Sequence, residues 1–246
     1  MSRAAAASSG LLGGKLTLKQ AGGYRAALDP LLLAASLALK PGDHAVELGC
    51  NAGAALLSAA VLNRDVRFTG VERDGQAAHL ADENAAVNGL CDQVEIVHGD
   101  ALTWRPSAAL DAVFFNPPFF DDPSVLRAPS PDKREAWINE AGLAAWIGAG
   151  LKRLREGGRL TLIQRADRLS DILRALEAKA GGVAVLPVHP RKDEPAKRVI
   201  VSAVKVSKAP LRLLPGLVLH DGPGGAYIPE ADAILRGDAQ TALARL

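Results

Sequence analysis

The chain has 246 residues, of which 48% are hydrophobic and 23% are charged, and this ordinary globular composition excludes a disordered or collagen-like protein. Lys and Arg number 29 against 27 Asp and Glu, so the net charge of +2 by itself argues against general nucleic-acid binding. No apolar run approaches the roughly 18 residues of a membrane span, and we expect a cytoplasmic protein without a membrane partner.

From residue 44 onward, short apolar runs alternate with helix-compatible stretches. Strands alternating with helices indicate βαβ units and a mainly parallel sheet. The predicted strands are 44–48, 66–71, 94–97, 111–115 and 159–163, and the predicted helices are 54–62, 76–87, 135–154 and 168–180.

The pattern changes after residue 180, where two strand-like runs, 183–188 and 199–206, follow each other without a helix between them. A βα array that ends in an antiparallel hairpin resembles the Rossmann-like class I methyltransferase fold. We therefore expect an α/β fold with a seven-stranded, mainly parallel sheet, a terminal antiparallel hairpin, and helices on both faces. The predicted division is a flexible tail and covering segment over 1–40, a methyltransferase domain over 41–212, and an extension over 213–246 packed on that domain.

Two cysteines, Cys50 and Cys91, are too few for a disulfide framework and do not have the spacing of zinc ligands. Both lie among apolar residues, so we expect two small buried side chains. No metal site is predicted.

A glycine-containing loop joins the first predicted strand to the first predicted helix. Glycine lets a backbone turn sharply and approach a ligand, so Gly49, Asn51 and Gly53 are predicted to contact a cofactor. Glu47 precedes the first glycine by two residues, and its carboxylate can accept from a cationic amine directly or through water. The spacing differs from the G-x-G-x-x-G of dinucleotide-binding proteins, and a tight turn without a ligand is the alternative.

Acidic residues also follow the second and third predicted strands. Ligands of open α/β sheets lie at the carboxyl ends of the strands, where Glu72 can accept both ribose hydroxyls. Asp100, with Ala101 beside it, is predicted to receive the exocyclic amine of an adenine. Either acid could instead cap a helix, although Asp74 fits that role better than Glu72. An adenosine with an attached cation fits all three strand ends, which indicates S-adenosylmethionine and leaves NAD as the competitor.

The segment Asn116-Pro117-Pro118-Phe119 directly follows the fourth predicted strand. Its prolines stiffen the chain and remove two backbone donors, so the segment presents carbonyl oxygens. The Asn116 carboxamide oxygen can accept one N–H of a planar amine and the Pro117 carbonyl the other, while Phe119 offers a stacking face. We predict catalysis by positioning, without a strong base, and a cofactor contact for Asn116 as well. A proline-rich turn that ends a strand is the alternative.

The motif (D/N/S)-P-P-(Y/F/W), met by residues 116–119, resembles that of class I methyltransferases that modify amino groups. Phe119 stands where Tyr is commoner, which keeps the stacking face but removes a hydroxyl. The motif is shared by adenine-N6, guanine-N2 and glutamine-N5 methyltransferases.

Other segments resemble the bacterial tRNA adenine-N6 methyltransferase family over roughly residues 11 to 236. The resemblance implies methylation of an adenosine beside the anticodon of a valine tRNA, in which the target base is already unpaired. The similar segments are 13–20, 22–25 and 29–34 at the start of the chain and 194–199 in the late hairpin.

In such enzymes the opening segment folds over the cofactor, which implies that Tyr24, Arg25 and Asp29 lie near its methionine end. Tyr24 and Arg25, together with Lys197 and Arg198, are the predicted contacts to substrate and RNA. Asp29 before a proline is equally an ordinary helix N-cap.

Two basic segments support an RNA partner. Residues 1–28 carry +4 and residues 187–212 carry +5, so the small net charge conceals local excesses. We expect the two segments to meet on one face, although solvated basic surfaces are the simpler alternative.

Several other functions stay open. The same motif chemistry serves guanine-N2 methylation of rRNA and glutamine-N5 methylation of protein, and the latter predicts a helical N-terminal domain in place of the roughly 40 residues that precede the first strand. A catalytically silent nucleotide-binding module would have no use for residues 116–119. The oligomeric state and the role of residues 213–246 carry no signal in the sequence.

Overall fold

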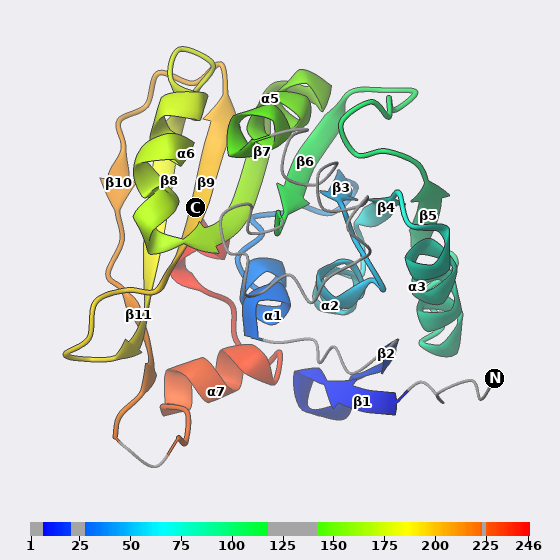
Figure 1. Ribbon diagram of the computed structural model, residues 1–246, viewed down its shortest axis with the longest axis horizontal. Coiled ribbons are helices and arrows are strands. Elements are labelled where there is room, and N and C mark those ends of the chain that lie inside the picture. The colour runs from blue at the N-terminus through cyan, green and yellow to red at the C-terminus, as the bar shows by residue number, and fades with distance from the viewer. Residues whose placement is uncertain (1–6, 21–27, 118–141, 223–224) are drawn as a thin grey trace, which may run out of the picture.

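The computed structural model describes residues 7–20, 28–117, 142–222 and 225–246. Its centre is a nine-stranded sheet with the order β10-β8-β9-β7-β6-β3-β4-β5, and β11 pairs with β8 beside this path. Helices cover both faces, and a separate two-stranded hairpin, β1–β2, lies next to α2 and α3 (Figure 1). The predicted α/β class with a mainly parallel sheet is confirmed.

Five strands of the sheet run parallel to one another, and each overlaps a predicted strand. Because parallel strands point the same way, their carboxyl ends meet at one edge, where ligands of such sheets bind. The strands are β3 (His44–Leu48), β4 (Arg67–Glu72), β5 (Val94–His98), β6 (Leu110–Phe115) and β7 (Leu154–Arg165).

The predicted terminal hairpin is formed by β8 (Ala180–Arg191) and β9 (Arg198–Lys205), and β9 is antiparallel to both β7 and β8. The chain then returns along the free edge of β8 and adds two short parallel strands, β10 (Arg212–Leu213) and β11 (Leu217–His220). These additions extend the predicted seven strands to nine.

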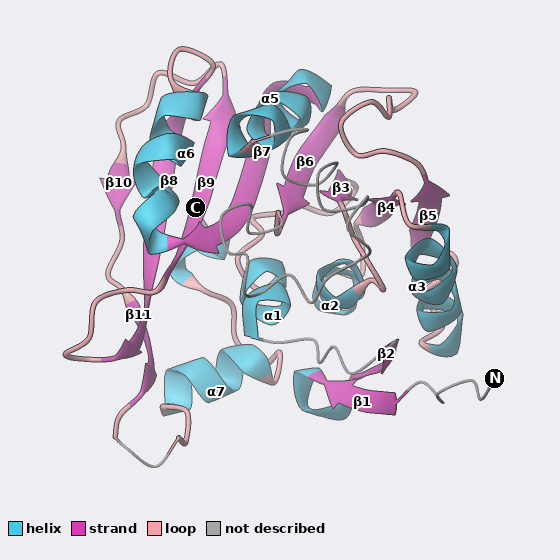
Figure 2. Cartoon of the chain, viewed as in Figure 1, coloured by secondary structure: helices cyan, strands magenta, loops and turns pink. Residues whose placement is uncertain are grey.

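The sheet divides the hydrophobic core into two layers, one on each face, and the helices that cover the sheet are drawn in cyan in Figure 2. Buried leucines of α1 and α2 fill one layer, and buried residues of α5 and α6, such as Ile147 and Ile172, fill the other. The helices are α1 (Leu28–Ala34), α2 (Ala54–Leu62), α3 (Gly75–Val87), α5 (Leu143–Arg153), α6 (Leu169–Leu176) and α7 (Pro229–Leu235), with short 3₁₀ turns η1 (Leu12–Gly14), η2 (Ala166–Arg168) and η3 (Ala242–Arg245).

The hairpin of β1 (Ala7–Leu11) and β2 (Leu16–Gln20) is a feature that the sequence patterns do not predict. Its leucines, including Leu12 and Leu16, are buried in the same core as Ile234 and Leu243 near the other end of the chain. The division of the chain at residues 40 and 212 stays a prediction.

The cysteine expectation is half wrong. Cys50 is buried, but Cys91 is exposed, because in the turn after α3 it is Leu90 that enters the core, with 2% of its surface exposed. In the described part of the chain, no helix has the length and apolar character that a membrane crossing requires.

Candidate active site

The loop after β3 is a tight turn in which residues adopt left-handed backbone conformations. Gly49, Asn51 and Gly53 have φ values of 71°, 49° and 88°. The N–H groups of Gly49 and Cys50 both donate to the Val71 carbonyl, at 2.8 and 3.2 Å, which anchors the loop to β4. Glycine and asparagine tolerate these conformations best, so the residue types predicted to form a ligand loop are the ones that this turn requires.

Trp146 of α5 lies directly over this loop and was not predicted as a site residue. A Cβ atom at position 49 would lie 2.9 Å from Cη2 of Trp146, so only glycine fits beneath the indole. The indole also packs on Phe115, with ring centroids 5.8 Å apart. A tryptophan within the predicted helix 135–154 gives no signal of this contact, which depends on how α5 crosses the sheet.

Glu72, at the end of β4, holds the backbone of two loops. Its Oε2 accepts the N–H of Asn51 at 2.9 Å, and its Oε1 accepts the N–H of Asp74 at 2.9 Å. Asp74 itself caps α3, accepting from Gln76 and Ala77, as the sequence indicates. Because each carboxylate oxygen has more than one lone pair, these bonds leave Glu72 able to accept ribose hydroxyls.

Asp100, two residues after β5, accepts hydrogen bonds from the turn that follows it, and no helix begins there for it to cap. Its Oδ1 accepts the N–H groups of Leu102 and Thr103 at 2.6 and 3.3 Å, while the residue stays exposed. Ala101 beside it is buried. These bonds to Oδ1 orient the carboxylate and leave Oδ2 able to accept the adenine amine.

Arg153 of α5 fixes the loop that carries Asp100. It is 4% exposed, and its guanidinium donates to the carbonyl of Trp104, from Nε at 2.8 Å and also from Nη2, and to the carbonyl of Ala149. Burial lowers the pKa of Arg153, and the nearby Arg105 lowers it further. A basic residue in the last turn of a helix gives no hint of this role from sequence alone.

Two buried oxygens at the site have no hydrogen-bond partner among the described residues, Oε2 of Glu47 and Oδ1 of Asn116. They belong to neighbouring parallel strands, because Glu47 pairs with Phe114, two residues before Asn116. Burial raises the pKa of Glu47 well above its ordinary value of 4.5, and the charge of Glu72 raises it further against a backbone hydrogen bond with Leu56. Both unpartnered atoms are acceptors, so the site is built to receive N–H donors.

Other predicted site residues are placed less completely. Pro117 is buried after β6, whereas Pro118, Phe119, Tyr24 and Arg25 lie outside the described residues. Asp29 lies within the first turn of α1.

Asp29 also forms a link to the late hairpin. Its Oδ2 accepts from Nε of Arg198 at 2.9 Å, with the two side chains 15% and 31% exposed. Lys197, next to this pair, is exposed. The ion pair joins the start of α1 to β9 beside the carboxyl end of β7, near the edge of the sheet that carries Asn116.

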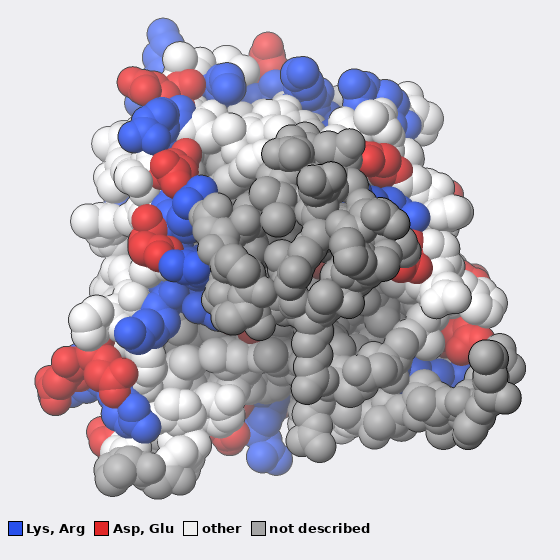
Figure 3. Space-filling model, viewed as in Figure 1, with Lys and Arg blue, Asp and Glu red and all other residues white. Residues whose placement is uncertain are grey.

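The predicted basic face is wrong for the part of the first segment that is described. Lys15 pairs with Asp238 at 2.7 Å and Lys19 with Glu83 at 3.3 Å, so these cations lie beside acids of the C-terminal segment and α3. Lys19 lies beside α3, which packs on β4 and β5, at the opposite end of the sheet from β8 and β9. On the visible face, Lys and Arg over α6 and towards the β8–β9 turn are interspersed with Asp and Glu (Figure 3).

A family model described as "Methyltransferase small domain" matches residues 28–186, well over half of the chain. The chain belongs to the methyltransferase small domain family. Domains of this family are methyltransferase domains, whose cofactor is S-adenosylmethionine.

Curated relatives of this chain include two named tRNA1(Val) (adenine(37)-N6)-methyltransferase. The one from Porphyromonas gingivalis is 32% identical over 158 residues, 60% of this chain and 61% of the relative. The one from an Enterobacter species is 30% identical over 134 residues, 53% of this chain and 54% of the relative. The chain thus spans little more than half the length of these relatives.

A solved structure extends the similarity over most of the chain. The crystal structure of a predicted O-methyltransferase from Agrobacterium tumefaciens, protein Atu636, superposes with a TM-score of 0.72 at 25% identity, covering 87% of this chain and 98% of that one. A Thermotoga maritima methyltransferase, with a TM-score of 0.53 at 20% identity, shares the fold.

The residues at the strand ends fit S-adenosylmethionine. The unpartnered, buried Oε2 of Glu47 suits the cationic amine, Glu72 suits the ribose hydroxyls, and Asp100 suits the adenine amine. Among the described residues no group of three or more His, Cys, Asp or Glu side chains could hold a metal ion.

Proposed function

We propose that this methyltransferase transfers a methyl group to the N6 amine of an adenosine in RNA, with the tRNA position next to the anticodon as the first candidate. The observation that carries the proposal is the buried Oδ1 of Asn116, which has no hydrogen-bond partner among the described residues at the end of β6. A buried acceptor without a donor is costly in a folded protein, and an amine N–H of a substrate supplies the donor.

Asn116 and Pro117 carry the substrate side of the reaction. Oδ1 of Asn116 accepts one N–H of the exocyclic amine, and the carbonyl of Pro117, which has no N–H of its own, can accept the second. Two such bonds draw the planar nitrogen towards tetrahedral geometry and aim its lone pair. S-adenosylmethionine, when bound, supplies an electrophilic methyl group on its sulfonium.

No general base is required before the attack, because the methylated amine is acidic enough to lose its proton afterwards. The chain's contribution is therefore orientation and the exclusion of water, which can account for a large share of a rate enhancement. Glu47, Glu72 and Asp100 are assigned to the cofactor and take no part in proton transfer.

The RNA assignment is supported by the printed names of the relatives and by the hairpin beside the site. The exposed Lys197 and the Arg198–Asp29 pair place cationic groups near the carboxyl end of β7, next to the strand that carries Asn116. Phosphate contacts from such groups position RNA without reading its sequence. An unpaired anticodon-loop adenosine enters a pocket at lower cost than a base extruded from a duplex.

Incubation with radiolabelled S-adenosylmethionine and separate preparations of total tRNA, rRNA, DNA and protein tests the proposal. The expected result is label in tRNA that digests to N6-methyladenosine. Label as N2-methylguanosine in rRNA or as N5-methylglutamine in protein would replace the proposed substrate with one of the alternatives. The Asn116→Ala protein, assayed in parallel, provides the background.

A further inference from the structure

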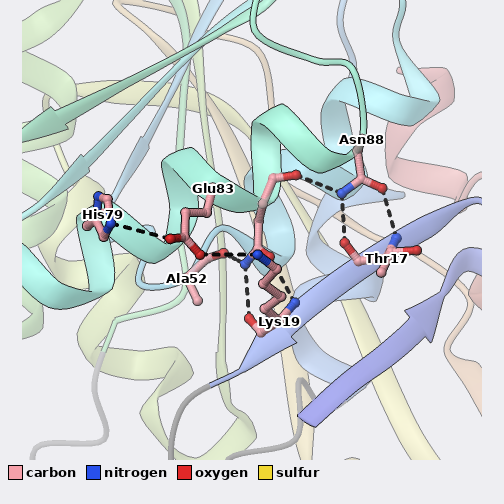
Figure 4. Close-up of polar contacts among 7 residues, drawn as sticks. Thr17, Lys19, Ala52, His79, Glu83 and Asn88 are labelled. Atoms are coloured by element: carbon pink, nitrogen blue, oxygen red, sulfur yellow. Dashed lines mark hydrogen bonds and ion pairs between the residues drawn. The ribbon is translucent and has the colours of Figure 1, made fainter. Parts of the chain in front are cut away.

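The side-chain amide of Asn84 joins the N-terminal hairpin to the loop after β3. Asn84 is fully buried in α3, with 0% of its surface exposed, where an amide without partners would be destabilising. Its Oδ1 accepts the N–H of Lys19 at 2.8 Å, and its Nδ2 donates to the carbonyls of Lys19 and Ala52, both at 3.0 Å. Both partners, Lys19 and Ala52, are labelled in Figure 4. One side chain therefore connects β2, α3 and the cofactor loop.

Asn88, one helical turn later, repeats the contact with the hairpin. Its Oδ1 accepts the N–H of Thr17 at 2.9 Å, and its Nδ2 donates to the carbonyls of Thr17 and Asn84, both at 2.7 Å. Residues four apart on a helix rise by about 6 Å, close to the spacing of roughly 6.7 Å between alternate residues of a strand. The two amides therefore act as a substitute strand along the outer edge of β2.

The surface charges of the hairpin add little to this docking. The Lys19–Glu83 pair, at 3.3 Å, has side chains 39% and 43% exposed, and exposed ion pairs contribute little stability. The backbone-to-amide bonds of Asn84 and Asn88 are thus the specific polar contacts between β2 and α3.

The contact with Ala52 distinguishes Asn84 from Asn88. Ala52 lies between Asn51 and Gly53, two residues in left-handed conformations, and its carbonyl is held by Asn84 while the Asn51 N–H is held by Glu72. The amide that orients this carbonyl makes its other two bonds to Lys19. Undocking of β2 would break two of the amide's three hydrogen bonds, so its orientation depends on the β1–β2 hairpin.

We infer that Asn84 is a positioning residue that couples docking of the N-terminal hairpin to the shape of the cofactor loop. The inference rests on the proposed assignment of residues 49–53 to S-adenosylmethionine and is independent of the methyl acceptor. By thermodynamic linkage, cofactor binding strengthens hairpin docking by the same factor by which the docked hairpin strengthens cofactor binding.

Calorimetric titration of two matched variants with S-adenosylmethionine tests the inference. In Asn84→Asp the carboxylate still accepts from Lys19 but has no N–H for the carbonyls of Lys19 and Ala52. Asn88→Asp makes the same change on the same helix and strand without a loop contact. We expect Asn84→Asp to weaken cofactor binding on the order of tenfold and Asn88→Asp to leave it unchanged. Equal losses in the two variants, or no loss in a folded Asn84→Asp, would overturn the coupling.

Amide hydrogen exchange of the wild-type protein gives a second test that does not depend on the folding of any variant. Saturating S-adenosylmethionine should slow exchange of the Lys19 N–H. An amide at Lys19 that exchanges at the same rate with and without cofactor would contradict the inference, because a purely structural Asn84 gives the hairpin no response to the cofactor.

These readouts separate the inference from the proposed function. Neither measurement uses RNA, so coupling in a protein that methylates no nucleic acid would refute the proposed function alone. If Glu72→Ala left cofactor affinity unchanged, the assignment of the loop would be wrong, and the coupling inferred through it would be wrong with it.

Discussion

The N–H of Asn51 donates to Oε2 of Glu72 at 2.9 Å, so the carboxylate that ends β4 holds the loop that follows β3. The other oxygen of Glu72 holds the N–H of Asp74, at the start of α3. One side chain thereby holds together the loops that follow β3 and β4. The ribose of the cofactor is proposed to bind between these loops.

Glu72→Gln should weaken S-adenosylmethionine binding on the order of tenfold, and Glu72→Ala should weaken it further. In glutamine, an NH₂ group replaces one of the two oxygens that accept from the N–H groups of Asn51 and Asp74, so one of these donors loses its acceptor. The ribose hydroxyls also lose a charged partner. Isothermal calorimetry measures the loss. Glu95→Gln, an exposed change on the adjacent β5, serves as the control, and equal affinities for the Glu72 and Glu95 variants would remove Glu72 from the cofactor site.

Asn116→Ala should reduce the rate of methyl transfer at saturating cofactor on the order of a hundredfold or more, while S-adenosylmethionine still binds. The variant removes the acceptor that positions the amine and leaves Glu47, Glu72 and Asp100, which are assigned to the cofactor, in place. Asn116→Asp keeps an acceptor oxygen and should retain part of the activity. Single-turnover assays with labelled cofactor report the rates, and full turnover by Asn116→Ala would refute the assigned role.

Glu47→Gln should alter the pH dependence of stability. Because burial raises the pKa of Glu47 above 4.5, its folded form holds the proton more tightly than its unfolded form. Its contribution to stability is complete below about pH 4.5 and is lost as the pH rises through the raised pKa. The variant cannot ionise, so without cofactor its Tm at pH 8 should exceed that of the wild type. Each kcal/mol of difference in unfolding free energy corresponds to about 2–4 °C in Tm. The difference in Tm should become smaller towards pH 5.

The same variant should bind S-adenosylmethionine less tightly at pH 8, since an amide pairs poorly with a cationic amine. Thermal melts across pH, with and without cofactor, measure both effects. A difference in Tm that stays constant from pH 5 to pH 8 would show that Glu47 is not the titrating group.

Lys197→Ala should weaken RNA binding and lower the slope of log K against log salt by about 0.7–0.9, the value expected for one lost phosphate contact. Lys40→Ala, an exposed change at the amino-terminal edge of the sheet before β3, should leave the slope unchanged. Binding titrations with tRNA at several salt concentrations give both slopes. If Lys197→Ala and the wild type have the same slope of log K against log salt, the β8–β9 hairpin does not contact RNA through Lys197.

The parallel sheet could be predicted from the sequence because each strand is a short apolar run bounded by polar or glycine residues. The helix α2 spans Ala54–Leu62, as predicted, and Asp74 caps α3, as the sequence indicates. The strand-end acids follow from the same reasoning, since a parallel sheet brings its carboxyl ends together wherever the chain runs next.

The hairpin β1–β2 and its asparagine contacts could not be predicted in this way. Asn84 and Asn88 stand in an Ala-rich helix, where polar residues ordinarily indicate a solvated face, yet Asn84 is fully buried. Their partners are backbone groups of Thr17 and Lys19. Because every residue except proline has the same backbone groups, the sequence does not show which residues form such contacts. Trp146 and Arg153 were missed for a related reason, because their roles arise from the way α5 lies across the sheet.

The shared core of the two ends of the described chain constrains the order in which this protein can assemble during synthesis. Leu12 packs in the cluster that contains Ile234 and Leu243, and Nζ of Lys15 donates to the Gly237 carbonyl at 3.1 Å. A ribosome adding about 5–20 residues per second needs on the order of ten seconds or more to travel from Leu12 to Leu243. Throughout that interval the core around Leu12 lacks the part that Ile234 and Leu243 supply, so its completion follows the emergence of η3.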